Sequence, residues 1–198
     1  EALAARLPLR DGAAWDAFDD IERELDDAAV VARHAGFEVS AAPLLRSLSS
    51  AGRLRSVSAA PAQEVVLSEM AALLEGVGSP GFALPPPAVV LVLGGAGTGA
   101  STLCGHLAAR LGCTYLQQDA LPAEAADEGS EAGLMAEELL AAGKVLPLSL
   151  RVSLIAEAMS RMAGGTYLID GLTTAEEVSA LEEALGAPCA AALHLALT

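Results

Sequence analysis

The sequence predicts an α/β fold, in which a parallel sheet of about five strands carries helices on its faces. Beyond residue 87, short apolar segments alternate with longer amphipathic segments, which is typical of parallel strands joined by helices. The predicted strands are residues 88–93, 113–117, 166–170 and 190–197. The predicted helices are residues 101–111, 130–142, 148–163 and 174–185.

Ligands of such sheets bind beyond the carboxyl ends of the strands, which share one edge. We therefore expect residues 94–101, 118–119 and 170–174 to converge at that edge. These three segments contain the polar and glycine residues from which a site could be built.

The first part of the chain predicts further helices and one short strand. The pattern gives a helix within residues 15–37, a helix over 43–52, a strand over 55–59 and a helix over 61–76. The second of these helices is expected to begin at Pro43 and to be closed by Gly52. We divide the chain into residues 1–77, a Gly/Pro linker over 78–87, and residues 88–198.

Charge and composition limit the partners. The net charge is −15, and residues 85–198 hold four basic against thirteen acidic side chains, so nucleic acid is not expected to bind. The apolar segments are shorter than the roughly 18 residues of a membrane span, and no signal peptide is visible. We expect a cytoplasmic protein, part of a longer chain, with no membrane partner. Its three cysteines are expected to be reduced thiols: Cys104, Cys113 and Cys189.

The segment LGGAGTGAST, residues 93–102, is a glycine-rich turn between a strand and a helix. In the phosphate-loop pattern G-x-x-x-x-G-K-[ST], Gly94, Gly99 and Ser101 match, and Ala100 replaces the lysine. Such a loop turns backbone N–H groups toward phosphate oxygens, and the hydroxyl of Ser101 would help to hold magnesium.

The same segment also fits the dinucleotide-binding pattern G-x-G-x-x-G/A. Gly95, Gly97 and Ala100 take the three small-residue positions, and Asp119 follows near the end of the next predicted strand. An acidic residue there would bind a ribose hydroxyl. The loop alone leaves both interpretations open.

Four motifs in succession resemble the adenylate kinase (nucleoside monophosphate kinase) family. LGGAGTGASTLCGHLAARLG looks like the family's GGPGSGKGTQ-type loop and first helix, and YLQQDAL stands where the family has S-T-G-D-L-L-R. GSEAGLMAEELLAAGKVLP is similar to G-S-x-x-G … G-K-L-V-P, and YLIDGLTT to L-I-D-G-F-P-R. Order and spacing hold from Ala88 to Thr198. The resemblance implies a P-loop NTPase-like sheet, without a recognisable lid domain.

The resemblance also indicates which positive charges are missing. The family's loop lysine falls on Ala100, its acceptor-side arginine on Pro122, and the arginine of D-G-F-P-R on Thr174. Because phosphoryl transfer depends on positioning and electrostatic stabilisation, we expect a pseudokinase. The arginines of the predicted helices are expected on solvated faces: Arg110, Arg151 and Arg161.

Other positions remain compatible with binding of ATP or ADP with magnesium. The resemblance implies that Asp170 takes the place of the family's aspartate at the end of a strand, near magnesium. It also implies that Asp119 takes the place of the aspartate in the acceptor-binding segment. Either aspartate could instead cap a helix. We assign no catalytic residue and no metal site. The candidate cofactor-binding residues are Gly94, Gly95, Gly97, Thr98, Gly99, Ser101, Thr102, Asp119 and Asp170.

Residues 33–76 are similar to the C-terminal end of the same family. Arg33 matches the arginine of R-L-x-x-Y and would reach a phosphate if this segment docks on the rest. A C-terminal half that precedes an N-terminal half has two explanations. The chain is cut from a tandem array, which we favour, or it is a permuted domain in which residues 53–59 supply the missing edge strand.

We expect a catalytically degenerate adenylate kinase-like domain that serves as an assembly module, with other protein subunits of a larger assembly as partners. Tandem repeats of this kind are a feature of large ciliary proteins, so the resemblance implies a place in the cilium or flagellum axoneme. Residual binding of an adenine nucleotide stays open. Two alternatives also stay open: an active kinase that transfers a phosphoryl group from ATP to AMP, and a dinucleotide-binding Rossmann domain.

Overall fold

A computed structural model describes residues 27–75, 88–162 and 165–197. The part of the first predicted helix before residue 27 and the predicted linker over 78–87 lie outside the described residues.

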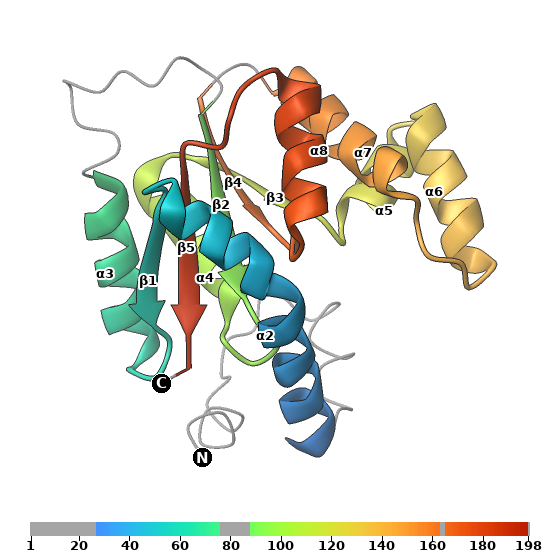
Figure 1. The fold of residues 1–198 in the computed structure, drawn as a ribbon. Coiled ribbons are helices and arrows are strands. Elements are labelled where there is room, and N and C mark those ends of the chain that lie inside the picture. The colour runs from blue at the N-terminus through green and yellow to red at the C-terminus, as the bar shows by residue number, and fades with distance from the viewer. Residues whose placement is uncertain (1–26, 76–87, 163–164, 198) are drawn as a thin grey trace.

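The predicted parallel sheet is confirmed. It has five strands in the order β1-β5-β2-β4-β3, and every neighbouring pair is parallel (Figure 1). The strands are β1 (Leu54–Ser58), β2 (Ala88–Gly94), β3 (Thr114–Gln117), β4 (Thr166–Asp170) and β5 (Ala191–Ala196). Residues 88–93 of the central strand β2 are all buried, because helices cover both faces of the sheet.

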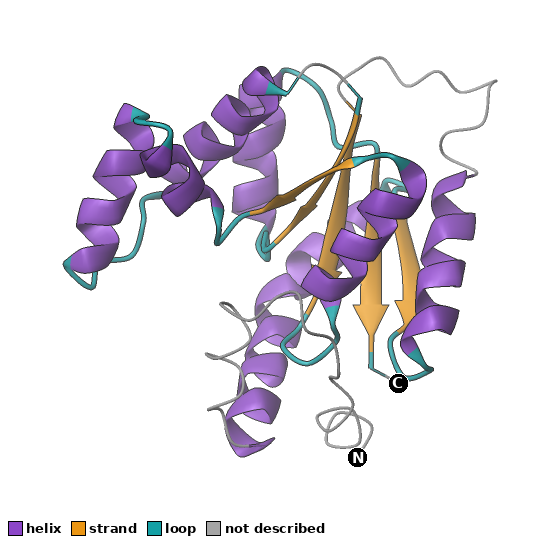
Figure 2. Ribbon diagram, turned by 180° about the vertical axis from the view of Figure 1, so that it is seen from behind, coloured by secondary structure: helices purple, strands orange, loops and turns teal. Residues whose placement is uncertain are grey.

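Two hydrophobic clusters, one on each face, hold the helices to the sheet. Side chains of α3 and α4 form the cluster on one face, and side chains of α2, α7 and α8 join the cluster on the other. Figure 2 shows, from behind, helices on both faces of the sheet. The pair α5 and α6 projects beyond the β3 edge (Figure 1). The helices are α2 (Asp27–Ser50), α3 (Gln63–Glu75), α4 (Ala100–Leu111), α5 (Leu121–Asp127), α6 (Glu131–Ala141), α7 (Leu148–Arg161) and α8 (Ala175–Leu185).

The prediction of two separate helices around Pro43 is wrong, because α2 continues through this proline. A proline removes the hydrogen bond to the carbonyl four residues earlier, here that of Val39. Val39 is 79% exposed, so water can reach this turn. On the opposite side Ala41 and Leu44 are buried against the sheet, and this packing outweighs the local preference for a break.

The helix α5 was absent from the prediction, although the sequence carries a signal for its start. Pro122 lies in its first turn, where a proline is well tolerated because the N–H group there has no partner within the helix. The next helix, α6, begins after Ser130, whose hydroxyl accepts from the backbone N–H of Gly133 at 3.3 Å.

The strand β1 joins the first part of the chain to the same sheet as the rest. Leu54 to Ser58 pair in register with Ala192 to Ala196 of β5. Arg53 adds an ion pair to Glu182 of α8 at 2.5 Å. The tandem or permuted origin of this order stays a prediction. Within the described residues, no helix combines the length and the apolar character that crossing a membrane requires.

Candidate nucleotide-binding site

The glycine-rich loop lies between β2 and α4. Gly97 and Gly99 have positive φ angles of 81° and 76°, so the turn requires glycine at both positions. Thr98 is buried, and its hydroxyl and its backbone N–H both donate to the carbonyl of Gly95, at 2.8 and 3.2 Å. The helix α4 begins at Ala100 without a side-chain cap. Among the residues that the structure describes, no side chain caps the N–H groups of this first turn, an arrangement that suits an anion.

Asp170, the last residue of β4, lies beside this loop. Its Oδ2 accepts hydrogen bonds from the hydroxyls of Ser101 and Tyr115, both at 2.8 Å. Burial raises the pKa of Asp170, and the charge of Asp119 adds to the rise, whereas the two hydroxyl donors oppose it. Burial and the Asp170 charge also raise the pKa of Tyr115, so the phenol stays protonated and acts as the donor.

The second oxygen of Asp170, Oδ1, is buried and has no hydrogen-bond partner within the described residues. A buried acceptor without a partner is uncommon in folded proteins. Carboxylate and hydroxyl oxygens are ligands that magnesium accepts. Asp170 and Ser101 therefore fit a cation held next to the phosphate loop.

Asp119 and Thr102 are exposed at the same edge of the sheet. Asp119 follows β3, in the turn before α5, but it does not cap that helix, because the N-cap residue is Ala120. Its neighbour Gln118 is buried, and its amide accepts from Arg151 Nη1 and donates to the carbonyl of Gly171, both at 3.1 Å. The expected convergence of the three loops is therefore present.

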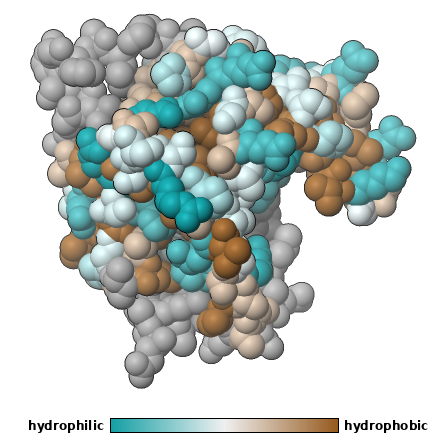
Figure 3. Space-filling model, in the orientation of Figure 1, coloured by the Kyte–Doolittle hydropathy of each residue, from teal (hydrophilic) through white to brown (hydrophobic). Residues whose placement is uncertain are grey.

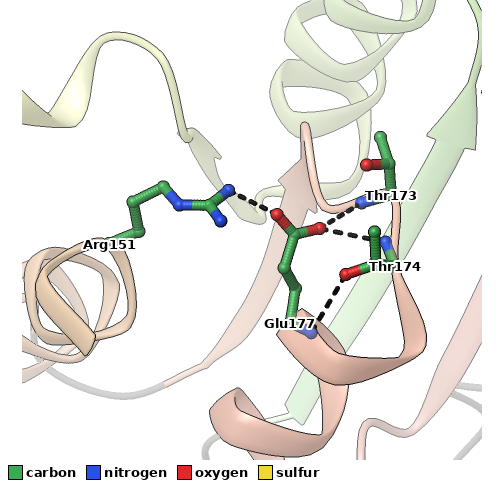
Figure 4. A network of polar contacts seen from close by, with 4 residues as sticks. All are labelled: Arg151, Thr173, Thr174 and Glu177. Carbon is green, nitrogen blue, oxygen red and sulfur yellow. Dashed lines mark hydrogen bonds and ion pairs between the residues drawn. The ribbon is translucent and has the colours of Figure 1, made fainter. Parts of the chain in front are cut away.

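The two other positions that lack an arginine have structural roles. Pro122 is buried in the first turn of α5. Thr174 is the N-cap of α8: its hydroxyl accepts from Glu177 N, and the Glu177 carboxylate accepts from the N–H groups of Thr173 and Thr174 at 2.8 and 2.9 Å (Figure 4). This reciprocal pair is a capping box.

The expectation that Arg151 lies on a solvated face is wrong. Its guanidinium forms an ion pair with Glu177, whose side chain is only 8% exposed (Figure 4). Burial alone would raise the pKa of Glu177, but the N–H groups of Thr173 and Thr174, together with Arg151, hold this pKa below its ordinary value. Arg161 is likewise paired, with Glu128, whereas Arg110 is exposed as expected.

Replacing Glu177 by alanine is expected to lower the free energy of unfolding by about 2 kcal/mol, because the N–H groups of Thr173 and Thr174 lose their carboxylate acceptor and Arg151 loses its partner. Chemical denaturation measures this change. Since the folded state depresses the pKa of Glu177, its contribution is complete above the ordinary value of 4.5 and disappears as the pH falls below it. The matched control is the exposed neighbour, and a Glu176→Ala variant with an equal loss would contradict the prediction.

No protein-family model matches the chain, but curated proteins do. UMP-CMP kinase 3 of Oryza sativa subsp. japonica is 36% identical over 89 residues, which is 45% of this chain and 42% of that protein. UMP-CMP kinase of Gallus gallus is 35% identical over 97 residues, 46% of this chain and 50% of that protein. Adenylate kinase isoenzyme 1 of Cyprinus carpio is 35% identical over 104 residues, 50% of this chain and 53% of that protein.

The chain thus spans about half the length of the curated relatives that it matches. The matched names agree with the resemblance carried by the loop motifs, and the five-stranded parallel sheet agrees with a P-loop fold of the adenylate kinase type. Over the matched part, therefore, this chain is related to the nucleoside monophosphate kinases.

Proposed function

We propose that this chain is a catalytically degenerate nucleoside monophosphate kinase-like domain that binds the phosphates of ATP or ADP at the loop 94–99 and transfers phosphoryl groups poorly or not at all. The observation that carries the proposal is an ordered phosphate loop with Ala100 in the lysine position. The glycine turn, the uncapped start of α4 and the pair Ser101–Asp170 support binding.

Weak catalysis follows from the missing charge. The lysine of the phosphate-loop pattern neutralises the phosphoryl group that is being transferred. Removal of one such preorganised donor lowers the reaction rate by a factor of roughly 10²–10³. The capping role of Thr174 and the burial of Pro122 leave two more positions without a cation. Arg151 lies near but is already paired with Glu177. Magnesium, when bound, would screen the phosphate charge; Asp170 and Ser101 are the residues that would hold it.

The strand order argues against the dinucleotide-binding alternative. In Rossmann sheets the strand that leads into the glycine loop pairs with the next strand of the chain, which carries the ribose-binding acid. Here β2 pairs with β4 and β5, and β4 separates it from β3. Asp119 is therefore one strand farther from the glycine-rich loop than the dinucleotide-binding pattern requires.

The proposal includes a structural role, as an assembly module bound to other protein subunits. Apolar surface reaches solvent at the end of the molecule that carries α6 (Figure 3), where Leu134, Met135 and Leu140 are about half exposed. Such side chains suit a protein partner. A place in the ciliary or flagellar axoneme rests on the resemblance to tandem adenylate kinase-like arrays.

The test is a calorimetric titration with magnesium-ATP and separately with NADH, followed by a coupled phosphoryl-transfer assay with ATP and AMP, UMP or CMP. We expect ATP binding, no NADH binding and no turnover at ordinary kinase rates. The Ala100→Lys variant should bind ATP about 10- to 100-fold more tightly, since it adds a charge-assisted hydrogen bond. Ala100→Gln, which has similar length without the charge, serves as the control.

Turnover by the unmodified chain at ordinary kinase rates would establish the second candidate, an active kinase. The relatives named UMP-CMP kinase and adenylate kinase favour that candidate. Tight NADH binding without ATP binding would overturn both.

A further inference from the structure

The imidazole of His34 lies directly against the phosphate loop. The helix α2 crosses the sheet, and its first turns lie near the carboxyl ends of the strands (Figure 1). A Cβ atom added to Gly95 would overlap Nδ1 and Cε1 of His34 and lie in tight contact with Cγ. Glycine at position 95 therefore permits a contact between the ring and the loop backbone that a side chain would prevent.

One nitrogen of this ring lacks a partner. Nδ1 of His34 is buried, and no hydrogen bond reaches it from any described residue. Burial of a polar atom without a hydrogen bond is unfavourable, so such atoms call for an explanation. Nδ1 lies against Gly95, in the same loop that leads into the uncapped first turn of α4. An anion bound at this loop is the acceptor that we consider for Nδ1.

The other nitrogen faces a carboxylate. Nε2 of His34 is 3.7 Å from Oε1 of Glu38, one turn later in α2, and the same oxygen is 3.9 Å from Nε2 of His194 in β5. Burial lowers the pKa of His194, the nearby His34 adds to this effect, and Glu38 opposes it. The lowered pKa of His194 favours its neutral form, which would leave Glu38 as a partner for Nε2 of His34.

Within the described residues, the ionisable groups that face His34 are therefore Glu38 from α2 and His194 from β5. The loop contributes none, since residues 94–102 contain only glycine, alanine, serine and threonine. Arg33, the preceding residue of α2, is exposed. Glu38 lies at the Nε2 side of both rings, so neither Glu38 nor His194 would compete with a phosphate oxygen as the acceptor of a hydrogen bond from Nδ1.

We propose that His34, in its protonated form, donates from Nδ1 to a phosphate oxygen bound at the loop and supplies part of the positive charge that Ala100 does not. This inference rests on the proposed nucleotide binding. An imidazolium ring carries two N–H donors, so one can serve Glu38 while the other serves the ligand. Histidine as a residue type changes its charge within the range from pH 5 to pH 8, whereas lysine, which the phosphate-loop pattern has at position 100, does not.

The inference predicts pH-dependent binding that a packing role for His34 would not produce. The affinity for magnesium-ATP, measured by calorimetry, should be about tenfold higher at about pH 6 than at about pH 8. In His34→Gln the difference should disappear and the affinity should stay at the weaker value. In His34→Arg, which keeps the charge at both pH values, binding should stay tight at pH 8. The control is His106→Gln, because His106 is exposed on α4.

Titration of the nucleotide itself is common to all variants and cancels in the comparison. Thermal unfolding of each variant establishes that it is folded before binding is measured. ATP binding by the unmodified chain with the same pH dependence in His34→Gln would overturn the role of His34 alone. Failure of the unmodified chain to bind ATP at either pH would overturn the proposed function, and this inference with it.

Discussion

Replacing Gly133 by alanine is expected to lower the free energy of unfolding by about 3 kcal/mol, the upper range for overpacking in a well-packed core. Gly133 is the third residue of α6, after the N-cap Ser130, and lies against the backbone of α5. A Cβ atom here would overlap the backbone of Ala125 and Ala126, which cannot rotate away as a side chain can. The two helices would have to separate, and Ala136, now buried, would become accessible.

The chain offers a matched control in Gly36, which is exposed in α2 with no atom within 4 Å of an added Cβ. There the same substitution should stabilise the protein by about 0.5–1 kcal/mol, because alanine is the better helix former. Chemical denaturation gives both values, and hydrogen exchange over residues 121–141 localises the damage. If both variants gained stability, the close packing of α5 on α6 would be refuted.

The sheet could be predicted because its strands are local signals. Three of the four strands after residue 87, β2, β4 and β5, are short and almost entirely buried apolar segments bounded by loops, so their pattern depends little on what packs against them. In the edge strand β3 only Leu116 is buried. The helix α2 shows the opposite case. Pro43 is a strong local breaker, and only the burial of Ala41 and Leu44 against distant strands keeps the helix continuous.

Some residues of the candidate site could likewise be predicted from local sequence, and others could not. The loop 94–99 is a contiguous motif and could be found from its glycines. The partners of that loop could not, because Asp170 meets Ser101 across 69 residues and Tyr115 across 55. The contact of His34 with Gly95 joins residues from different predicted segments. A single histidine in a helix gives no local sign of such a contact.

The ion pair of Arg151 could not be predicted from the sequence. Its position on a predicted amphipathic helix is typical of a solvated residue, yet the structure pairs it with Glu177 at the start of α8. The sequence does contain one signal, the capping box formed by Thr174 and Glu177. This signal marks a buried carboxylate that needs a positive partner, but it does not identify which arginine supplies it.

Replacing Asp170 by asparagine is expected to weaken magnesium-ATP binding about 100-fold, the upper range for the loss of an interaction that supports a metal. The carboxylate is 4% exposed, and it is the buried anion nearest to the loop hydroxyl of Ser101. Asparagine keeps an oxygen that can accept from Ser101 and Tyr115, so the local packing should survive. Calorimetry with and without magnesium should show that the loss is confined to the magnesium-dependent part of binding.

The same substitution should raise the stability of the ligand-free protein at neutral pH by about 1 kcal/mol, since it removes a charge that burial disfavours. Asp127→Asn, at the exposed end of α5, makes the same chemical change and should alter neither quantity. Opposite signs for stability and affinity are the mark of a residue retained for a ligand rather than for the fold. A variant that lost stability and kept magnesium-dependent binding would instead make Asp170 a structural acceptor for its two hydroxyl neighbours.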